Sequence, residues 1–122
     1  MNADKFTQKT IETIQTAQSM AQENGNQYLT PEHLLYALVD ADGGLIGTLL
    51  GRMGVDCNAV LSELDTAIDQ LPKVSGGSGE VYASPETSKI FNFAEREAKS
   101  GGDAYVSVEH LFLSLIENAD DT

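Results

Sequence analysis

Two segments of the chain have similar sequences. Residues 30–40 read TPEHLLYALVD, and residues 107–117 read SVEHLFLSLIE, at an offset of 77. Pairing residues 6–40 with residues 83–117 without gaps gives nine identities in 35 pairs, and several other pairs match apolar with apolar. A repeat of this kind indicates a fold assembled from copies of one supersecondary unit. We therefore expect two related units that pack side by side.

Helical signals fill both copies. Apolar residues recur every three or four positions, while no stretch alternates apolar and polar residues as a half-buried strand would. Thr30-Pro31-Glu32 and Ser84-Pro85-Glu86 each combine an N-cap, a proline at the first helical position and an acid in the first turn. The sequence predicts an all-α fold with helices over residues 7–24, 31–40, 45–53, 57–71 and 85–100, and a last helix that Ser107 caps.

The repeat also predicts the domain organisation. We expect one domain over residues 1–122, with repeat one at 4–72, a linker at 73–82 and a partial repeat two at 83–122. Shifted by 77, the third and fourth helices of repeat one would fall at 122–148, so the sequence predicts a tandem repeat of four-helix units with the second truncated. Leu111, Phe112, Leu115 and Ile116 would then lack apolar neighbours, which favours self-association.

Composition narrows the classes of partner. The formal net charge is −12, from 19 acids against 7 bases, and an acidic surface repels phosphate backbones and anionic membranes. We therefore expect no nucleic acid and no membrane as partners. One cysteine, no apolar signal segment at the start and no long apolar run favour a reducing, cytoplasmic location.

No motif predicts chemistry within these residues. The phosphate-binding pattern G-x-x-x-x-G-K-[ST] is absent, and DADGG at 40–44 lacks the later ligands of a calcium loop. His33 and His110 each follow a glutamate, but they occupy equivalent repeat positions and lack the spacing of a zinc site. We expect no catalytic residue, no cofactor and no metal in this domain.

Together, the two related phrases and the intervening LPKVSGGSGEVYASPET resemble the N-terminal domain of Clp-family AAA+ unfoldases over essentially the whole chain. Within that family the LPKVSGG linker is most similar to the ClpB disaggregase type. The resemblance implies a domain built as a pseudo-twofold pair of four-helix repeats. It also implies that this domain is tethered to a hexameric AAA+ ring, with ATP and Mg in AAA+ modules beyond these residues. It also implies a chaperone function in the stress response, in which the domain binds unfolded or aggregated polypeptide and delivers it to the ring.

The resemblance also suggests site residues. Positions that match Thr7, Asp103 and Glu109 lie on the face linked to substrate handling in Clp N-domains. Each of these residues has a structural alternative here, as helix cap, turn residue and first-turn acid respectively.

Asymmetry between the repeats adds three more candidates. Ile90 and Phe93 stand where repeat one has Thr13 and Thr16, which we place off the shared core stripe. These large apolar side chains either pack between the repeats or form a shallow groove for client segments. His110 heads the neighbouring helix and is expected to border such a groove.

Two functions of different kinds remain at this stage. The first is a substrate-engaging module of a ClpB-like disaggregase. The second is a docking module that binds a folded adaptor of a Clp protease-associated unfoldase. A middle coiled coil between two Walker modules downstream would favour the first, and a protease-docking loop would favour the second. An enzyme in its own right has no support among these residues.

Overall fold

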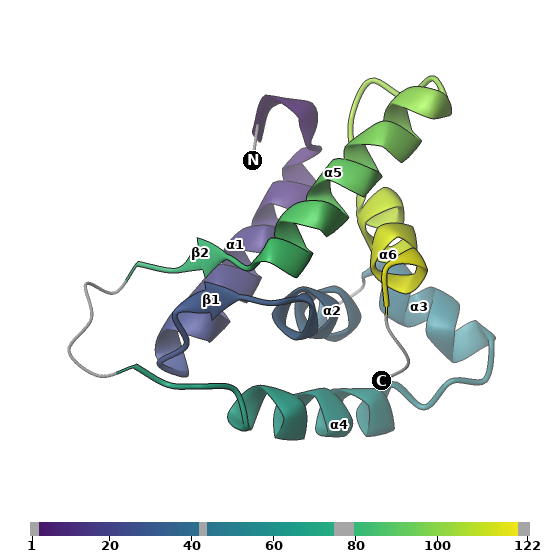
Figure 1. The fold of residues 1–122 in the computed structure, drawn as a ribbon. Helices are drawn as coiled ribbons and strands as arrows, with labels where there is room; N and C mark the ends of the chain where they lie inside the picture. Colours follow the sequence, from purple (N-terminus) through teal and green to yellow (C-terminus); the bar gives the residue numbers. More distant parts are fainter. Residues whose placement is uncertain (1–2, 42–43, 75–79, 120–122) are drawn as a thin grey trace.

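A computed structural model describes residues 3–41, 44–74 and 80–119 of the chain. Within these ranges the fold is predominantly α-helical, as predicted, and the central linker residues 75–79 lie outside the description (Figure 1). In chain order the elements are η1 (Ala3–Lys5), α1 (Gln8–Glu23), β1 (Tyr28–Leu29), α2 (Pro31–Asp40), α3 (Leu45–Arg52), α4 (Cys57–Asp69), β2 (Tyr82–Ala83), α5 (Pro85–Ser100) and α6 (Val108–Glu117).

Side-chain caps explain where several of these helices begin. Thr7 and Ser84 accept hydrogen bonds from the backbone N–H groups of Thr10 and Thr87, three residues on in each case. These bonds satisfy one of the amides that an α-helix leaves unpaired in its first turn. After α1 and α5 the chain turns at Gly25 and Gly102, whose φ angles of 75° and 78° favour glycine.

Short backbone segments of the two repeats pair with each other. β1 pairs with β2 in parallel, with Leu29 opposite Ala83, and Phe6 forms a parallel bridge with Val106. An offset of 77 relates Leu29 to Val106 and Phe6 to Ala83, so each repeat contributes the same two segments to its partner. The expectation that the chain has no strand is therefore wrong for these two-residue segments, although they leave the helical architecture unchanged.

Buried threonine hydroxyls stabilise this pairing between the repeats. The buried Thr10 donates its hydroxyl hydrogen to the carbonyl oxygen of Val106 over 3.0 Å, and Thr87 donates to that of Leu29 over 2.8 Å. The 77-residue offset relates these bonds too. Because a buried carbonyl without a donor would be costly, identical threonines at this position have a structural reason.

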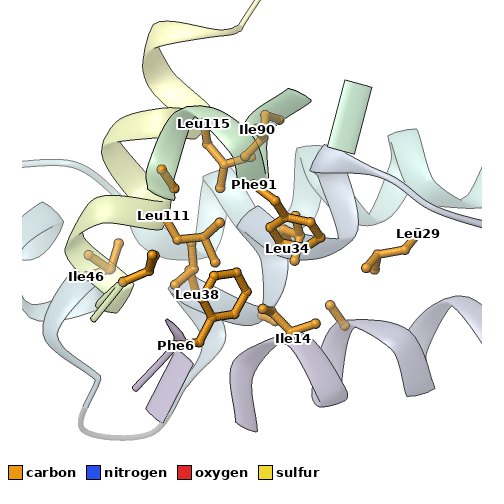
Figure 2. Close-up of a cluster of buried hydrophobic side chains, with 14 of the residues drawn as sticks. Phe6, Ile14, Leu29, Leu34, Leu38, Ile46, Ile90, Phe91, Leu111 and Leu115 are labelled. Atoms are coloured by element: carbon orange, nitrogen blue, oxygen red, sulfur yellow. The ribbon is translucent and has the colours of Figure 1, made fainter. Parts of the chain in front are cut away.

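One hydrophobic core joins the two repeats. α2 contacts all five other helices, and Figure 1 shows it near the centre, with α4 on one side and α1 and α5 on the other. In Figure 2 side chains from both repeats converge, and the rings of Phe6 and Phe91 have centroids 5.9 Å apart. Ile14 and Leu34 from repeat one meet Phe91 and Leu111 from repeat two in this cluster.

Ile90 belongs to this core. Its side chain is 2% exposed. Of the two alternatives, packing between the repeats and a groove for client segments, this burial supports the packing role for Ile90. The placement of its repeat counterpart Thr13 off the core stripe is also wrong, since Thr13 is 6% exposed. Thr13 is accommodated there because its hydroxyl donates to the carbonyl oxygen of Lys9, one turn earlier in the same helix.

The outer face of α6 lacks a cover that α2 has. α4 packs against α2, and Val39 on α2 is 5% exposed, whereas its repeat counterpart Ile116 on α6 is 53% exposed. Leu113 is similarly exposed, while Leu111 and Leu115 find apolar neighbours within the core. Phe112 is partly buried and packs against the core as well. The predicted lack of neighbours therefore applies to Ile116 but not to Leu111, Phe112 or Leu115.

We expect this apolar face to have a measurable consequence. The 122-residue chain should self-associate, or it should melt at a lower temperature than a chain continued to about residue 150. A second copy covers the exposed apolar surface in the first case, and the added residues cover it in the second. Light scattering and thermal melting of the two lengths provide the comparison. Two monomeric proteins with equal melting temperatures would contradict the expectation.

No single helix among the described residues is both long and apolar enough to span a membrane. α2 and α3 satisfy such a test only when they are taken together, as a pair bent by 79°.

Candidate functional site

Three of the predicted site residues gather where α1, α5 and α6 approach one another. Thr7 donates its backbone N–H to the carbonyl oxygen of Val106 over 3.0 Å. Asp103 and His110 lie on either side of Val106 in sequence, and they contact each other over 3.0 Å. Glu109 is exposed in the first turn of α6, where a negative charge stabilises the helix dipole.

Phe93 lies on α5 one turn beyond the buried Ile90 and is only partly buried. The guanidinium carbon of Arg96 is 5.7 Å from the centroid of its ring, within the range of a cation–π contact. Phe93 is thus the one large apolar candidate whose side chain remains accessible to a partner.

His110 has a definite structural role. Its Nδ1 accepts the backbone N–H of Ser107 over 3.0 Å, and Ser107 in turn caps α6. Because Nδ1 is an acceptor, the proton of the neutral ring is on Nε2, which donates to Asp103 over 3.0 Å. His110 therefore ties the start of α6 to the turn that follows α5.

His33 repeats this arrangement in a closed environment. Its Nδ1 accepts the backbone N–H of Thr30 over 3.0 Å, and its Nε2 donates to Asn26 Oδ1 over 3.0 Å. Asn26 also donates to the carbonyl oxygen of Pro72, at the end of repeat one. His33 is fully buried, whereas the side chain of His110 retains 18% exposure. Offset by 77, Asn26 corresponds to Asp103, so the two repeats use an amide and a carboxylate in the same role.

These contacts occupy both ring nitrogens of each histidine. Among the described residues, no group of three or more His, Cys, Asp or Glu side chains is placed to hold a metal ion. Each histidine thus has a structural role, and these roles account for the two Glu-His pairs without a metal. The absence of a specific metal site stays a prediction.

Burial of His33 predicts a dependence of stability on pH. Desolvation lowers the pKa of His33 below its ordinary value of 6.5, and the nearby Glu32 carboxylate opposes this shift only partly. Below pH 6.5 the unfolded chain binds a proton that the folded chain resists, so the free energy of unfolding should fall as pH falls from about 7.5 to 5.5.

Urea denaturation at several pH values tests this expectation. A His33→Gln variant, which cannot take up that proton, should lose less stability over the same interval than the parent chain. Parallel pH profiles for the two proteins would contradict a contribution from His33.

An open cleft of about 590 Å³ lies beside the C-terminal half of α5. We call it the α5 cleft. Its walls come from η1, α5 and the segment before α6, and its lining includes Lys5, Glu95, Arg96, Lys99, Asp103 and Tyr105. Asp103 is the only predicted site residue in this lining. Arg96 and Lys99 were not among the predicted site residues, although they are spaced by three residues and so lie near each other on the helix surface.

Comparison with known proteins gives the family. The profile of the Clp repeat (R) N-terminal domain matches residues 5–122. The chain belongs to this family. The Clp N-terminal domain is 41% identical over 121 residues to the chaperone protein ClpB of Rhodopseudomonas palustris, a match that covers 98% of this chain. It is 43% identical over 115 residues to ClpB of Brucella suis, which covers 94% of this chain.

The fold of this Clp N-terminal domain has a solved counterpart. It matches the N-terminal domain of Hsp104 from Candida albicans with a TM-score of 0.84 at 23% identity, covering 93% of this chain and 74% of that one. The chain spans only 14% and 13% of the length of the two ClpB relatives. These proteins share the domain, and their similarity confirms the predicted relationship to the ClpB type.

Proposed function

We propose that this domain is the substrate-engaging N-terminal module of an ATP-dependent ClpB-like disaggregase. It binds unfolded or aggregated polypeptide and passes it to an AAA+ ring. The identity to ClpB across nearly the whole chain supports the type of protein. The observation that carries the binding role is the partly exposed Phe93 on α5, the helix that also forms a wall of an open cleft.

The remaining parts of this proposal concern residues beyond the domain. We propose that the AAA+ body belongs to the same chain, assembles as a hexamer in the cytoplasm, and holds the ATP and Mg that drive the reaction. The domain itself contributes binding and no catalysis. In support, the ionisable pairs that are well placed for chemistry, such as Asp103 and His110, are engaged in capping and turn contacts.

The Phe93→Ser variant tests the binding role. Because the ring is only partly buried, its loss should lower the free energy of unfolding by about 1 kcal/mol or less. If the ring contacts clients, the affinity for an unfolded model polypeptide should fall about five- to tenfold, as for a binding hot spot. Fluorescence anisotropy with a labelled, permanently unfolded polypeptide measures the affinity, and thermal melting measures the stability.

Leu49→Ser is a matched control, since Leu49 is an exposed leucine on α3. It should leave client binding unchanged. Equal losses in the two variants would indicate a general effect of surface hydrophobicity. Unchanged binding in Phe93→Ser would remove the main support for the proposal.

A further inference from the structure

The α5 cleft is unusually rich in positive charge for this protein. Lys5, Arg96 and Lys99 are three of the seven basic residues in a chain of net charge −12, and all three are exposed. Among the described residues, the ion pair between a lysine and a carboxylate is that of Lys73 with Asp69, so neither Lys5 nor Lys99 is paired there. Two unpaired ammonium groups therefore face the solvent of one cleft.

Comparison of the two repeats shows that the fold does not require these charges. Shifting the cleft by 77 residues gives the related surface of repeat one, where Tyr105 and Ala98 have the identical counterparts Tyr28 and Ala21. Every charged position, however, is uncharged there. The pairs are Lys5 with Tyr82, Glu95 with Gln18, Arg96 with Ser19, Lys99 with Gln22, and Asp103 with Asn26.

One of the two acids in the cleft is already engaged. Asp103 accepts the hydrogen of His110 Nε2 over 3.0 Å, as Asn26 does from His33 in repeat one, so its carboxylate has a fixed partner. With both carboxylates counted, the three cations Lys5, Arg96 and Lys99 still outnumber Glu95 and Asp103 in the lining. The cleft thus has a net positive character that its related surface lacks.

We propose that the α5 cleft binds acidic segments of the client polypeptide. In such a segment one or two carboxylates pair with Lys5 and Lys99, and an adjacent apolar or aromatic side chain lies against the exposed ring of Tyr105. This inference rests on the proposed function and specifies one class of client sequence. Charge complementarity favours a short acidic peptide over a nucleic acid, because a long polyanion meets the repulsion of the whole −12 surface.

Three labelled peptides of equal length test the proposal. Each carries the same tryptophan and leucine, flanked by two aspartates, two asparagines or two lysines. The aspartate peptide should bind about three- to tenfold more tightly than the asparagine peptide, since an exposed ion pair changes an affinity by up to about fivefold. Fluorescence anisotropy against the 122-residue chain gives the dissociation constants.

The double variant Lys5→Gln/Lys99→Gln assigns the preference to the cleft. Lys99→Gln introduces the residue that repeat one has at the matching position, Gln22. The variant should bind the aspartate and asparagine peptides equally, while its affinity for the asparagine peptide and its melting temperature stay close to those of the parent. Lys9→Gln/Lys89→Gln is the control, because it changes the net charge equally at exposed positions outside the cleft lining. This control should retain the preference for aspartate.

The results separate this inference from the function on which it rests. Equal binding of the aspartate and asparagine peptides to the parent chain would overturn the acidic preference and leave client binding intact. A preference that survives in Lys5→Gln/Lys99→Gln, or disappears in the control, would overturn the assignment to the cleft. No binding of any peptide or of the unfolded polypeptide would overturn the proposed function itself. Tighter binding of a single-stranded oligonucleotide than of the aspartate peptide, lost in the double variant, would assign the cleft to nucleic acid.

Discussion

Replacing His33 with alanine is expected to lower the free energy of unfolding by about 3 kcal/mol, from unpaired polar groups and a cavity together. His33 is fully buried and joins the first turn of α2 to Asn26. Its removal leaves the N–H of Thr30 without its ring acceptor and removes a donor from the buried Asn26. Urea denaturation followed by circular dichroism measures the loss.

His110→Ala is the matched comparison. The same two ring nitrogens make equivalent contacts with Ser107 and Asp103, but Asp103 is exposed, so water can replace the lost donor. We expect a loss of about 1 kcal/mol, the usual value for a helix cap. Equal losses in the two variants would mean that burial does not separate the two repeats, contrary to this interpretation.

The sequence was informative about these histidines up to a definite limit. Their equivalent positions correctly predicted that both belong to the first turn of related helices. The sequence did not indicate that the histidine ring, rather than the preceding glutamate, completes the N-terminal cap of each helix. That contact depends on where Asn26 and Asp103 return after the turns at Gly25 and Gly102, which is a tertiary relationship.

Helix boundaries were predictable because their signals are local. Caps and prolines at Pro31 and Pro85 mark the first residues of α2 and α5, and the structure has both helices begin there. The parallel pairing of β1 with β2 was not predictable, since a two-residue strand has no periodicity and its partner is more than fifty residues away. The α5 cleft was not predictable for the same reason, because Lys5 and Lys99 line one cleft only in the folded chain.

Position 13 and position 90 show where the pattern misled. A threonine at position 13 predicts a polar site outside the core, yet a hydroxyl that bonds within its own helix can be buried without an external partner. Repeat symmetry places Ile90 at the same core position. The two repeats thus fill the same core position with different side chains, a threonine in one and an isoleucine in the other. This difference does not indicate an exposed groove.

Ile90→Ala is therefore expected to act on stability and not on client binding. The side chain is buried in the core. The backbone carbonyl of Ile90 accepts the hydroxyl hydrogen of the buried Ser114 over 2.7 Å, and this bond holds α5 and α6 together beside the side chain. A site that cannot collapse retains a cavity, and we expect a loss of about 3 kcal/mol in the free energy of unfolding. The neighbouring Lys89→Ala, at an exposed position of α5, should change stability by less than about 0.5 kcal/mol. Well below the melting temperature, the folded Ile90→Ala protein should bind the unfolded polypeptide as the parent does. A variant that melts normally but binds clients weakly would return Ile90 to the binding surface and contradict its place in the core.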